Sequence, residues 1–208
     1  MARLPRLSVA GWPHLVIHRG HNRQAVFADD EDRRQFRQML TEVARAHPVA
    51  VHAYGWSDNE LRLLLTPADA DALSRLMQAL GRRYGASFNR RHGRTGGLWD
   101  GRFRATVIDP EQHLLECMCF VEAVAGDDSD WCSAAHHLGR RNDPLVTDHA
   151  HYWALGNTPF EREAAYARRC EHPLTAARTR QIEDATLKGW PLGDARFVAG
   201  LASSTERR

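Results

Sequence analysis

The sequence predicts an α+β protein in which helices pack on an antiparallel sheet, and three features lead to this prediction. Residues 49–67 read as two extended segments around the turn residues Ser57-Asp58-Asn59. Apolar residues recur with helical spacing both before and after this hairpin. Shorter extended segments lie outside the two helices, so the expected order is strand, helix, hairpin, helix, strand, helix.

The elements before the hairpin follow from local signals. A first strand is expected at residues 14–20, where it leads into the polar loop Gly20-His-Asn-Arg23. A helix is expected within residues 27–46, because Asp29-Asp30-Glu31 places acids in its first turn, where the helix dipole favours them.

The second arm of the hairpin carries two polar side chains on one face. Glu60 and Arg62 are two residues apart, and side chains in a strand alternate between the two faces of a sheet. We therefore expect a functional site on this face of the strand.

The elements after the hairpin are rich in arginine. A second helix is expected to open at Asp69-Ala-Asp71 and to continue through Phe88. From Arg75 to Arg104 every charged residue except Asp100 is an arginine. Codon usage and phosphate binding are alternative explanations for the preference for arginine over lysine, but codon usage does not explain this clustering.

A second basic stretch lies at the start of the chain, where no acid precedes Asp29 and the basic residues are Arg3, Arg6, Arg19 and Arg23. The two stretches are expected to form one basic surface, although the net charge is only +2. In the second stretch, arginines suited to phosphate contacts alternate with glycines that let backbone approach a ligand. The aromatic residues there are candidates either for base stacking or for the core: Tyr84, Phe88, Trp99 and Phe103.

These stretches resemble the REP-associated tyrosine transposases, a bacterial group within the HUH single-strand endonucleases. The most specific match is residues 88–102, which are similar to the family pattern Phe-Asn-x-Arg-His-x-Arg-x-Gly-x-Leu-Trp-x-Gly-Arg. The resemblance covers about Met1 to Leu201. It implies a ferredoxin-like HUH fold and binding of single-stranded or hairpin (palindromic) DNA. The residues that it and the basic clustering assign to DNA contact are Arg19, Asn22, Arg23, Arg82, Arg83, Asn89, Arg90, Arg91, His92, Arg94, Trp99, Arg102 and Arg104.

Three positions depart from the catalytic pattern of that family. Where the family has a His-x-His pair that binds Mg²⁺ or Mn²⁺, this chain has Glu60 and Arg62, and a guanidinium has no lone pair to donate to a metal. Where the family has its nucleophilic tyrosine, within a helix expected at residues 111–125, this chain has Phe120, which has no hydroxyl. We therefore expect a DNA-binding protein with no metal, no cofactor and no strand cleavage by the family mechanism.

Two other functions stay open at this point. One is a nuclease that uses Glu60 with His52 or another nearby histidine, a metal ion and water as the nucleophile. The other is a structural or protein-interaction remnant whose basic face binds nothing specific. Metal-dependent cutting of DNA would indicate the first, and salt-dependent binding of hairpin DNA would exclude the second.

The rest of the sequence sets the domain organisation and the cellular context. A boundary is expected near residue 140, between a DNA-binding domain at 1–140 and a helical C-terminal extension at 141–208 with helices at 160–170 and 176–188.

The cysteines have no disulfide-scaffold spacing. No apolar run approaches the roughly 20 residues of a membrane span, so a cytoplasmic protein is expected. The oligomeric state and the DNA sequence bound are not predicted.

Overall fold

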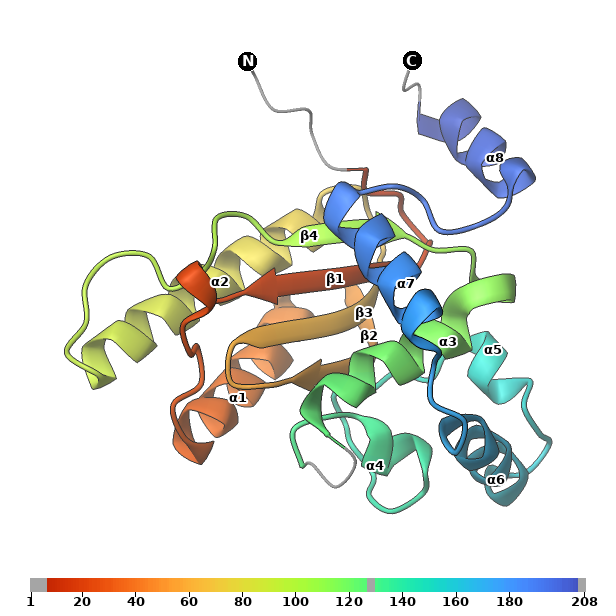
Figure 1. Cartoon of the computed structure of the whole chain (residues 1–208), viewed down its shortest axis with the longest axis horizontal. Helices are drawn as coiled ribbons and strands as arrows, with labels where there is room; N and C mark the ends of the chain where they lie inside the picture. Colours follow the sequence, from red (N-terminus) through yellow and green to blue (C-terminus); the bar gives the residue numbers. More distant parts are fainter. Residues whose placement is uncertain (1–6, 127–129, 206–208) are drawn as a thin grey trace.

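A computed structural model describes residues 7–126 and 130–205, with side chains as far as Ser203. Arg3 and Arg6 of the basic N-terminal stretch lie outside these residues. Figure 1 shows a central sheet with helices on both of its faces. The α+β class predicted from the sequence is confirmed.

The sheet has four antiparallel strands in the order β2-β3-β1-β4. They are β1 (His14–Arg19), β2 (Val49–Trp56), β3 (Glu60–Pro67) and β4 (Arg104–Val107). With α1 and α2 between them, the strands follow the ferredoxin-like order. The register of β1 on β3 places Arg19 directly opposite Glu60.

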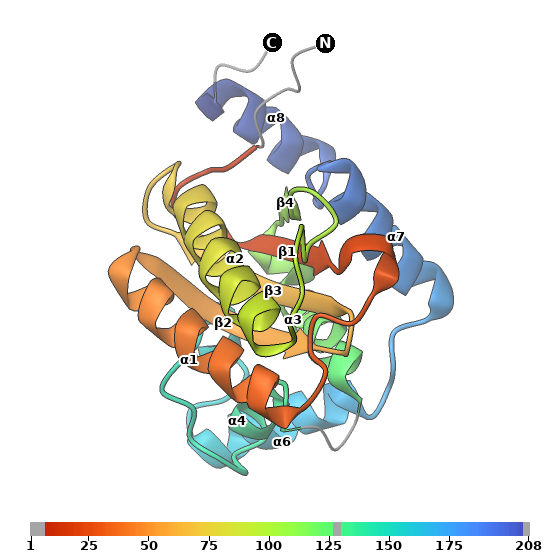
Figure 2. The same ribbon diagram turned by 90° about the vertical axis from the view of Figure 1, so that its left-hand side faces the viewer.

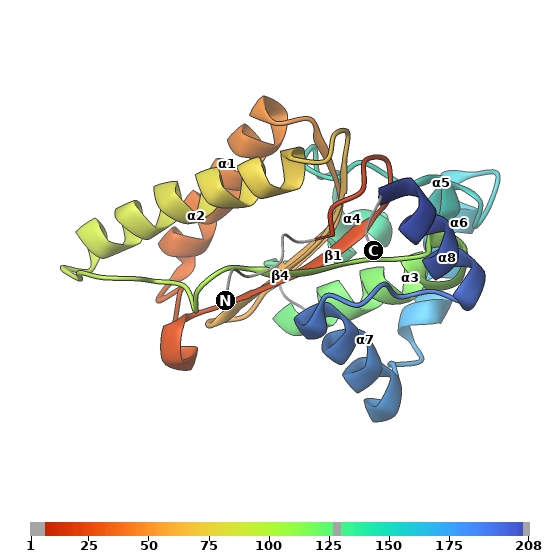
Figure 3. The same ribbon diagram turned by 90° about the horizontal axis from the view of Figure 1, so that it is seen from above.

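Helices α1 (Asp30–Ala46) and α2 (Ala72–Arg91) cover one face of the sheet, as Figure 3 shows. The start of α1 is fixed by Asp29, whose side chain accepts a hydrogen bond from the backbone N–H of Asp32 at 3.0 Å. Tyr84 and Phe88 on α2 are buried in the core beneath these helices, so they are core residues and do not stack on bases.

Helices α3 (Pro110–Glu122) and α7 (Ala176–Lys188) cover the opposite face. The start of α3 is set by Asp109, which accepts the N–H of Glu111 at 3.1 Å and precedes a proline at the first helical position. In Figure 1, α3 and α7 diverge toward the ends of β1 and β3 that carry Arg19 and Glu60.

The remaining segments are short helices and turns. They are η1 (His21–Arg23), η2 (Ala123–Ala125), α4 (Ala134–His137), α5 (Ala150–Trp153), α6 (Pro159–Cys170) and α8 (Ala195–Thr205). Tyr152, Tyr166 and Ile182 share one apolar core with Leu15 and Phe120, so segments on both sides of residue 140 build the same core. Figure 2 shows α8 at the far end of the molecule from α4 and α6.

Within the described residues, no helix combines the length and the apolar character needed to cross a membrane.

Candidate nucleic-acid interface

Glu60 and Arg62 lie together at the start of β3, on the face covered by α3 and α7. Arg62 Nε donates a hydrogen bond to Glu60 Oε1 at 2.6 Å. Arg19, opposite Glu60 on β1, donates from its Nε to the other carboxylate oxygen, Oε2. Both oxygens of Glu60 are therefore engaged by guanidinium groups.

Arg19 is held between two acids. Its second contact is with Glu183 of α7, to which Nη2 donates a hydrogen bond. Burial alone would lower the pKa of Arg19, but the hydrogen bonds to Glu183 and Glu60 outweigh burial and raise that pKa above its ordinary value. Arg19 therefore ties α7 to the sheet, a role that its sequence context does not suggest.

These residues do not fit a divalent metal ion. A carboxylate can ligate Mg²⁺ or Mn²⁺, but two guanidinium groups bound to that carboxylate repel a cation and offer no lone pair. His52, the other ligand considered from the sequence, donates from Nδ1 to Thr147 O at 2.7 Å and accepts the Thr66 hydroxyl at 2.8 Å. Thr66 is roughly 20 Å along β3 from Glu60, so the structure does not bring Glu60 and His52 together.

Phe120 completes this site from α3. Its ring centre lies 4.0 Å from the guanidinium carbon of Arg62, and its backbone oxygen accepts a hydrogen bond from Arg62 Nη1 at 2.8 Å. Arg62 thus contacts both of the other positions singled out from the sequence, Glu60 and Phe120.

The loop after β1 has an unusual backbone. Asn22 and Arg23 have φ values of +51° and +58°, in the left-handed region that residues other than glycine rarely adopt. Gly20 is required there, because a Cβ at this position would lie 2.0 Å from Gln24 O. Asn59 holds the loop by donating to Arg23 O at 3.2 Å, which leaves the side chains of Asn22 and Arg23 exposed.

One group of the residues predicted to bind DNA is engaged within the protein. Arg91 donates to both oxygens of Asp29, at 2.9 and 2.7 Å, and to Asp32 at 2.6 Å. These hydrogen bonds hold the pKa of Asp29 well below its usual range. His92 Nε2 also contacts Asp32, at 2.9 Å. Arg91 and His92 therefore fasten the end of α2 to the start of α1.

Three more predicted residues have partners inside the protein. Arg83 contacts Glu42 at 2.5 Å, and Arg94 donates to Gln24 at 3.0 Å. Asn89 Nδ2 donates to Gly96 O at 2.9 Å and so shapes the loop after α2.

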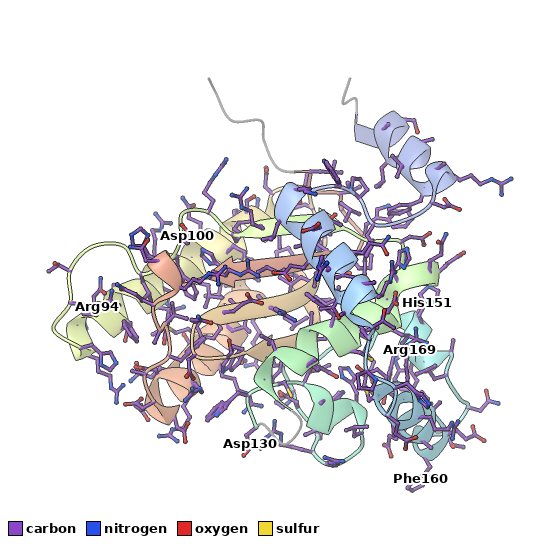
Figure 4. All side chains as sticks on the ribbon, in the orientation of Figure 1. Arg94, Asp100, Asp130, His151, Phe160 and Arg169 are labelled. Atoms are coloured by element: carbon purple, nitrogen blue, oxygen red, sulfur yellow. The ribbon has the colours of Figure 1, made fainter. Side chains whose placement is uncertain are left out.

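A second group of predicted residues is exposed and without an ion pair to any residue that the structure describes. These residues are Arg23, Arg82, Arg90, Arg102 and Arg104. Exposed guanidinium groups of this kind can neutralise phosphates without first breaking an internal contact. Figure 4 shows Arg94 and Asp100 at the end of the molecule where η1 and the last turns of α2 lie.

A cavity of about 760 Å³ lies between α2 and residues 96–103. Trp99 lines it and stacks on His18, with ring centres 4.3 Å apart and planes at 14°. Gly81 and Gly85 of α2 also line it, and each costs the helix about 1 kcal/mol relative to alanine. His18 precedes Arg19 on β1, so this cavity and the Glu60–Arg62 pair are on opposite faces of the sheet.

A buried polar cluster behind α3 was not predicted from the sequence. Glu122 accepts hydrogen bonds from Ser133 Oγ and His137 Nδ1, both at 2.6 Å, and from Tyr166 OH at 2.7 Å. The buried His137 packs in this cluster. The partners are too far apart along the chain for any local pattern to reveal the cluster.

His136, His137 and Asp148 place possible metal-ligand atoms within 4.8 Å of one another. His136 Nδ1 accepts the backbone N–H of Asp143 at 3.1 Å, so the ring proton is on Nε2, which donates to Asp148 at 3.2 Å. A protonated ring nitrogen cannot ligate a metal. The observed arrangement therefore favours a hydrogen-bonded cluster.

Comparison with solved structures identifies a protein whose fold is similar to that of this chain. A REP-associated tyrosine transposase bound to a REP hairpin is similar with a TM-score of 0.54 and 17% identity, over 72% of this chain and 96% of that chain. The chain has the fold of a REP-associated tyrosine transposase. A transposase candidate from Deinococcus radiodurans R1 is more weakly similar, with a TM-score of 0.39 and 20% identity over 55% of this chain and 93% of that chain. No family model matches the sequence, and no curated protein matches it.

On this transposase fold, the residues singled out from the sequence lie on two different surfaces. The contacting positions Glu60, Arg62 and Phe120 lie on the α3 face. The cavity with Trp99 lies on the α2 face, and exposed arginines lie along α2 and the segment that leads into β4.

Proposed function

We propose that this protein is a transposase-like DNA-binding protein that binds single-stranded or hairpin DNA without cleaving it. The observation that carries the proposal is the set of exposed arginines around α2 and residues 102–104 of a transposase fold, which form no ion pair with any described residue. The similar transposase was solved with a REP hairpin bound, which supports a hairpin as the ligand here. Such a protein would act in the bacterial cytoplasm, where chromosomal DNA is accessible.

The absence of cleavage rests on the contacts of Arg62. A tyrosine transposase needs a hydroxyl nucleophile and a metal ion that polarises the scissile phosphate. Phe120 offers no hydroxyl, and Arg62 occupies the space between Phe120 and the Glu60 carboxylate. Arg62 and Arg19 also supply positive charge that would repel the metal ion.

The test is fluorescence anisotropy of a labelled DNA hairpin with a single-stranded flank, measured over a range of salt concentrations. We expect wild-type affinity to fall steeply with salt, because each phosphate contact releases counterions. Replacing Arg82, Arg90 and Arg102 together with glutamine should reduce the slope of log K against log salt by about 2 to 3.

A charge-matched control removes three exposed arginines that lie outside α2 and the segment that leads into β4: Arg140, Arg168 and Arg180. This variant should bind with nearly the wild-type slope. Failure of the wild-type protein to bind any hairpin would contradict the proposal and favour a structural remnant. Metal-dependent cutting of the hairpin would instead favour a nuclease.

A further inference from the structure

Gly81 and Gly85 lie one helical turn apart on the side of α2 that borders the cavity. Neither has a positive φ, so the backbone does not require glycine at these positions. A glycine inside a helix lowers its stability. A pair of them on one face therefore needs a reason from packing or from a ligand.

Packing within the protein does not supply that reason. A Cβ at Gly81 would meet no atom closer than 3.7 Å, and one at Gly85 none closer than 3.9 Å, which are ordinary contact distances. On the facing segment, Gly96 has a φ of +86°, so its backbone conformation by itself favours glycine. The bare backbone of α2 at Gly81 and Gly85 keeps this wall of the cavity open to a group that approaches it closely.

The groups that remain in the cavity define the chemistry of its ligand. The Trp99–His18 stack supplies a flat aromatic wall. Arg82 and Arg102 line the same cavity with exposed positive charge. A ligand that matches these features has a flat ring and a negative charge.

We propose that this cavity receives an unpaired base of the bound DNA strand, with neighbouring phosphates on Arg82 and Arg102. The volume of about 760 Å³ is within the range of roughly 300–1,000 Å³ typical of small-ligand sites. The proposal rests on the proposed function, because it assumes that the protein binds DNA. It assigns base recognition to the α2 face, away from the Arg62–Phe120 contact.

The test fills the cavity without weakening the helix. Gly85→Leu and the milder Gly85→Ala both replace glycine with a better helix former, so both proteins should melt at or above the wild-type temperature. We expect Gly85→Leu to weaken binding of a hairpin with a single-stranded thymidine flank by about ten-fold or more. Binding of the same hairpin without the flank should change little.

A second measurement uses the wild-type protein alone. The thymidine flank is replaced by abasic residues, which keep the phosphates and remove the bases. We expect affinity to fall for the abasic flank, and thymidine binding to quench tryptophan fluorescence more than abasic binding does. Equal affinity for the two flanks would overturn the inference, as would a folded Gly85→Leu protein that binds the flanked hairpin like wild type.

The two proposals fail in different ways. If the wild-type protein binds neither hairpin, the proposed function itself is wrong. If it binds both hairpins equally and Gly85→Leu makes no difference, DNA binding stands and only the base cavity is excluded.

Discussion

The guanidinium carbon of Arg62 lies 4.0 Å from the centre of the Phe120 ring. The same guanidinium donates hydrogen bonds to Glu60 and to the backbone oxygen of Phe120. One side chain thus fills the space between β3 and α3, where the resemblance to the tyrosine transposases implies a metal ion and a nucleophile. Its consequences can be tested by separate measurements of metal binding, of DNA binding and of covalent protein–DNA adducts.

Metal binding should be absent in the wild-type protein. Arg62 and Arg19 occupy both oxygens of Glu60, so calorimetric titration with Mn²⁺ should give no heat of binding in the micromolar range. The double variant Glu60→His, Arg62→His removes the guanidinium group nearest to Phe120 and places two imidazoles on one strand face, so it should gain Mn²⁺ affinity even though Arg19 remains. Micromolar Mn²⁺ binding by wild type that disappears in Glu60→Ala would contradict this prediction.

Arg90 and Arg91 should respond differently to the same substitution. Arg90 is exposed without an ion pair in the described part of the chain, so Arg90→Gln should leave the melting temperature unchanged and lower the salt slope of DNA binding by about 0.9. Arg91 contacts Asp29 and Asp32, so Arg91→Gln should lower the melting temperature. Thermal melts and salt titrations of both variants decide this. The prediction is wrong if Arg91→Gln melts like wild type or Arg90→Gln keeps the full salt slope.

Local sequence signals predicted the hairpin and the helices well. The two extended segments at 49–67 are β2 and β3, and the helices expected at 160–170 and 176–188 are α6 and α7. These elements depend on turn residues, caps and periodic apolar positions, all of which are read within a few residues. The strand alternation that places Glu60 and Arg62 on one face is equally local.

The roles of individual charges could not be predicted in this way. Arg19 and Glu183 are 164 residues apart, and Arg91 and Asp29 are 62 apart. Whether an arginine is available for DNA depends on which acid the packing of α1, α2 and α7 brings beside it. A basic cluster in the sequence therefore overstates the number of free cations, and the cavity between α2 and residues 96–103 appears only once the fold is known.

The buried carboxylate of Glu122 should be important for stability. Glu122→Ala leaves the Ser133 hydroxyl, the His137 ring N–H and the Tyr166 hydroxyl without their acceptor, at a cost of about 3 kcal/mol or more. Urea unfolding measures this change. Glu171→Ala, at an exposed position, is the control and should stay within about 0.5 kcal/mol of wild type. Equal stability of the two variants would show that the buried cluster contributes nothing.

Acid should destabilise the protein through His14. Burial lowers the pKa of His14 from 6.5 to about 4, while its Nδ1 donates to Trp12 O and its Nε2 accepts the Val9 N–H. Between these two pH values the unfolded chain binds more protons, so stability is lost as the pH falls from about 6.5 to about 4. The contribution of this residue is on the order of 3 kcal/mol.

Unfolding measured at several pH values tests the role of His14. The His14→Gln variant should lose less stability than wild type between pH 6.5 and pH 4, and the exposed control His172→Gln should behave like wild type. Identical pH profiles for wild type and His14→Gln would exclude His14 as the source.

Restoring the hydroxyl should not by itself restore cleavage. Phe120→Tyr leaves Arg62 over the ring and Glu60 occupied, so no phosphotyrosyl bond to DNA should form. The triple variant Glu60→His, Arg62→His, Phe120→Tyr removes the Arg62 guanidinium, restores two imidazoles and restores the hydroxyl, and it is the one expected to form an adduct. An adduct from Phe120→Tyr alone would show that the contacts of Arg62 do not block the chemistry.

The most direct test of the central claim is one denaturing gel of the wild-type protein incubated with labelled hairpin DNA and Mn²⁺, run beside a native gel of the same mixture. We predict a shifted complex on the native gel, together with uncut DNA and no covalent protein–DNA band on the denaturing gel. A covalent band or a cut strand from the wild-type protein would contradict the account, because Arg62, Glu60 and Phe120 provide neither a metal site nor a hydroxyl nucleophile.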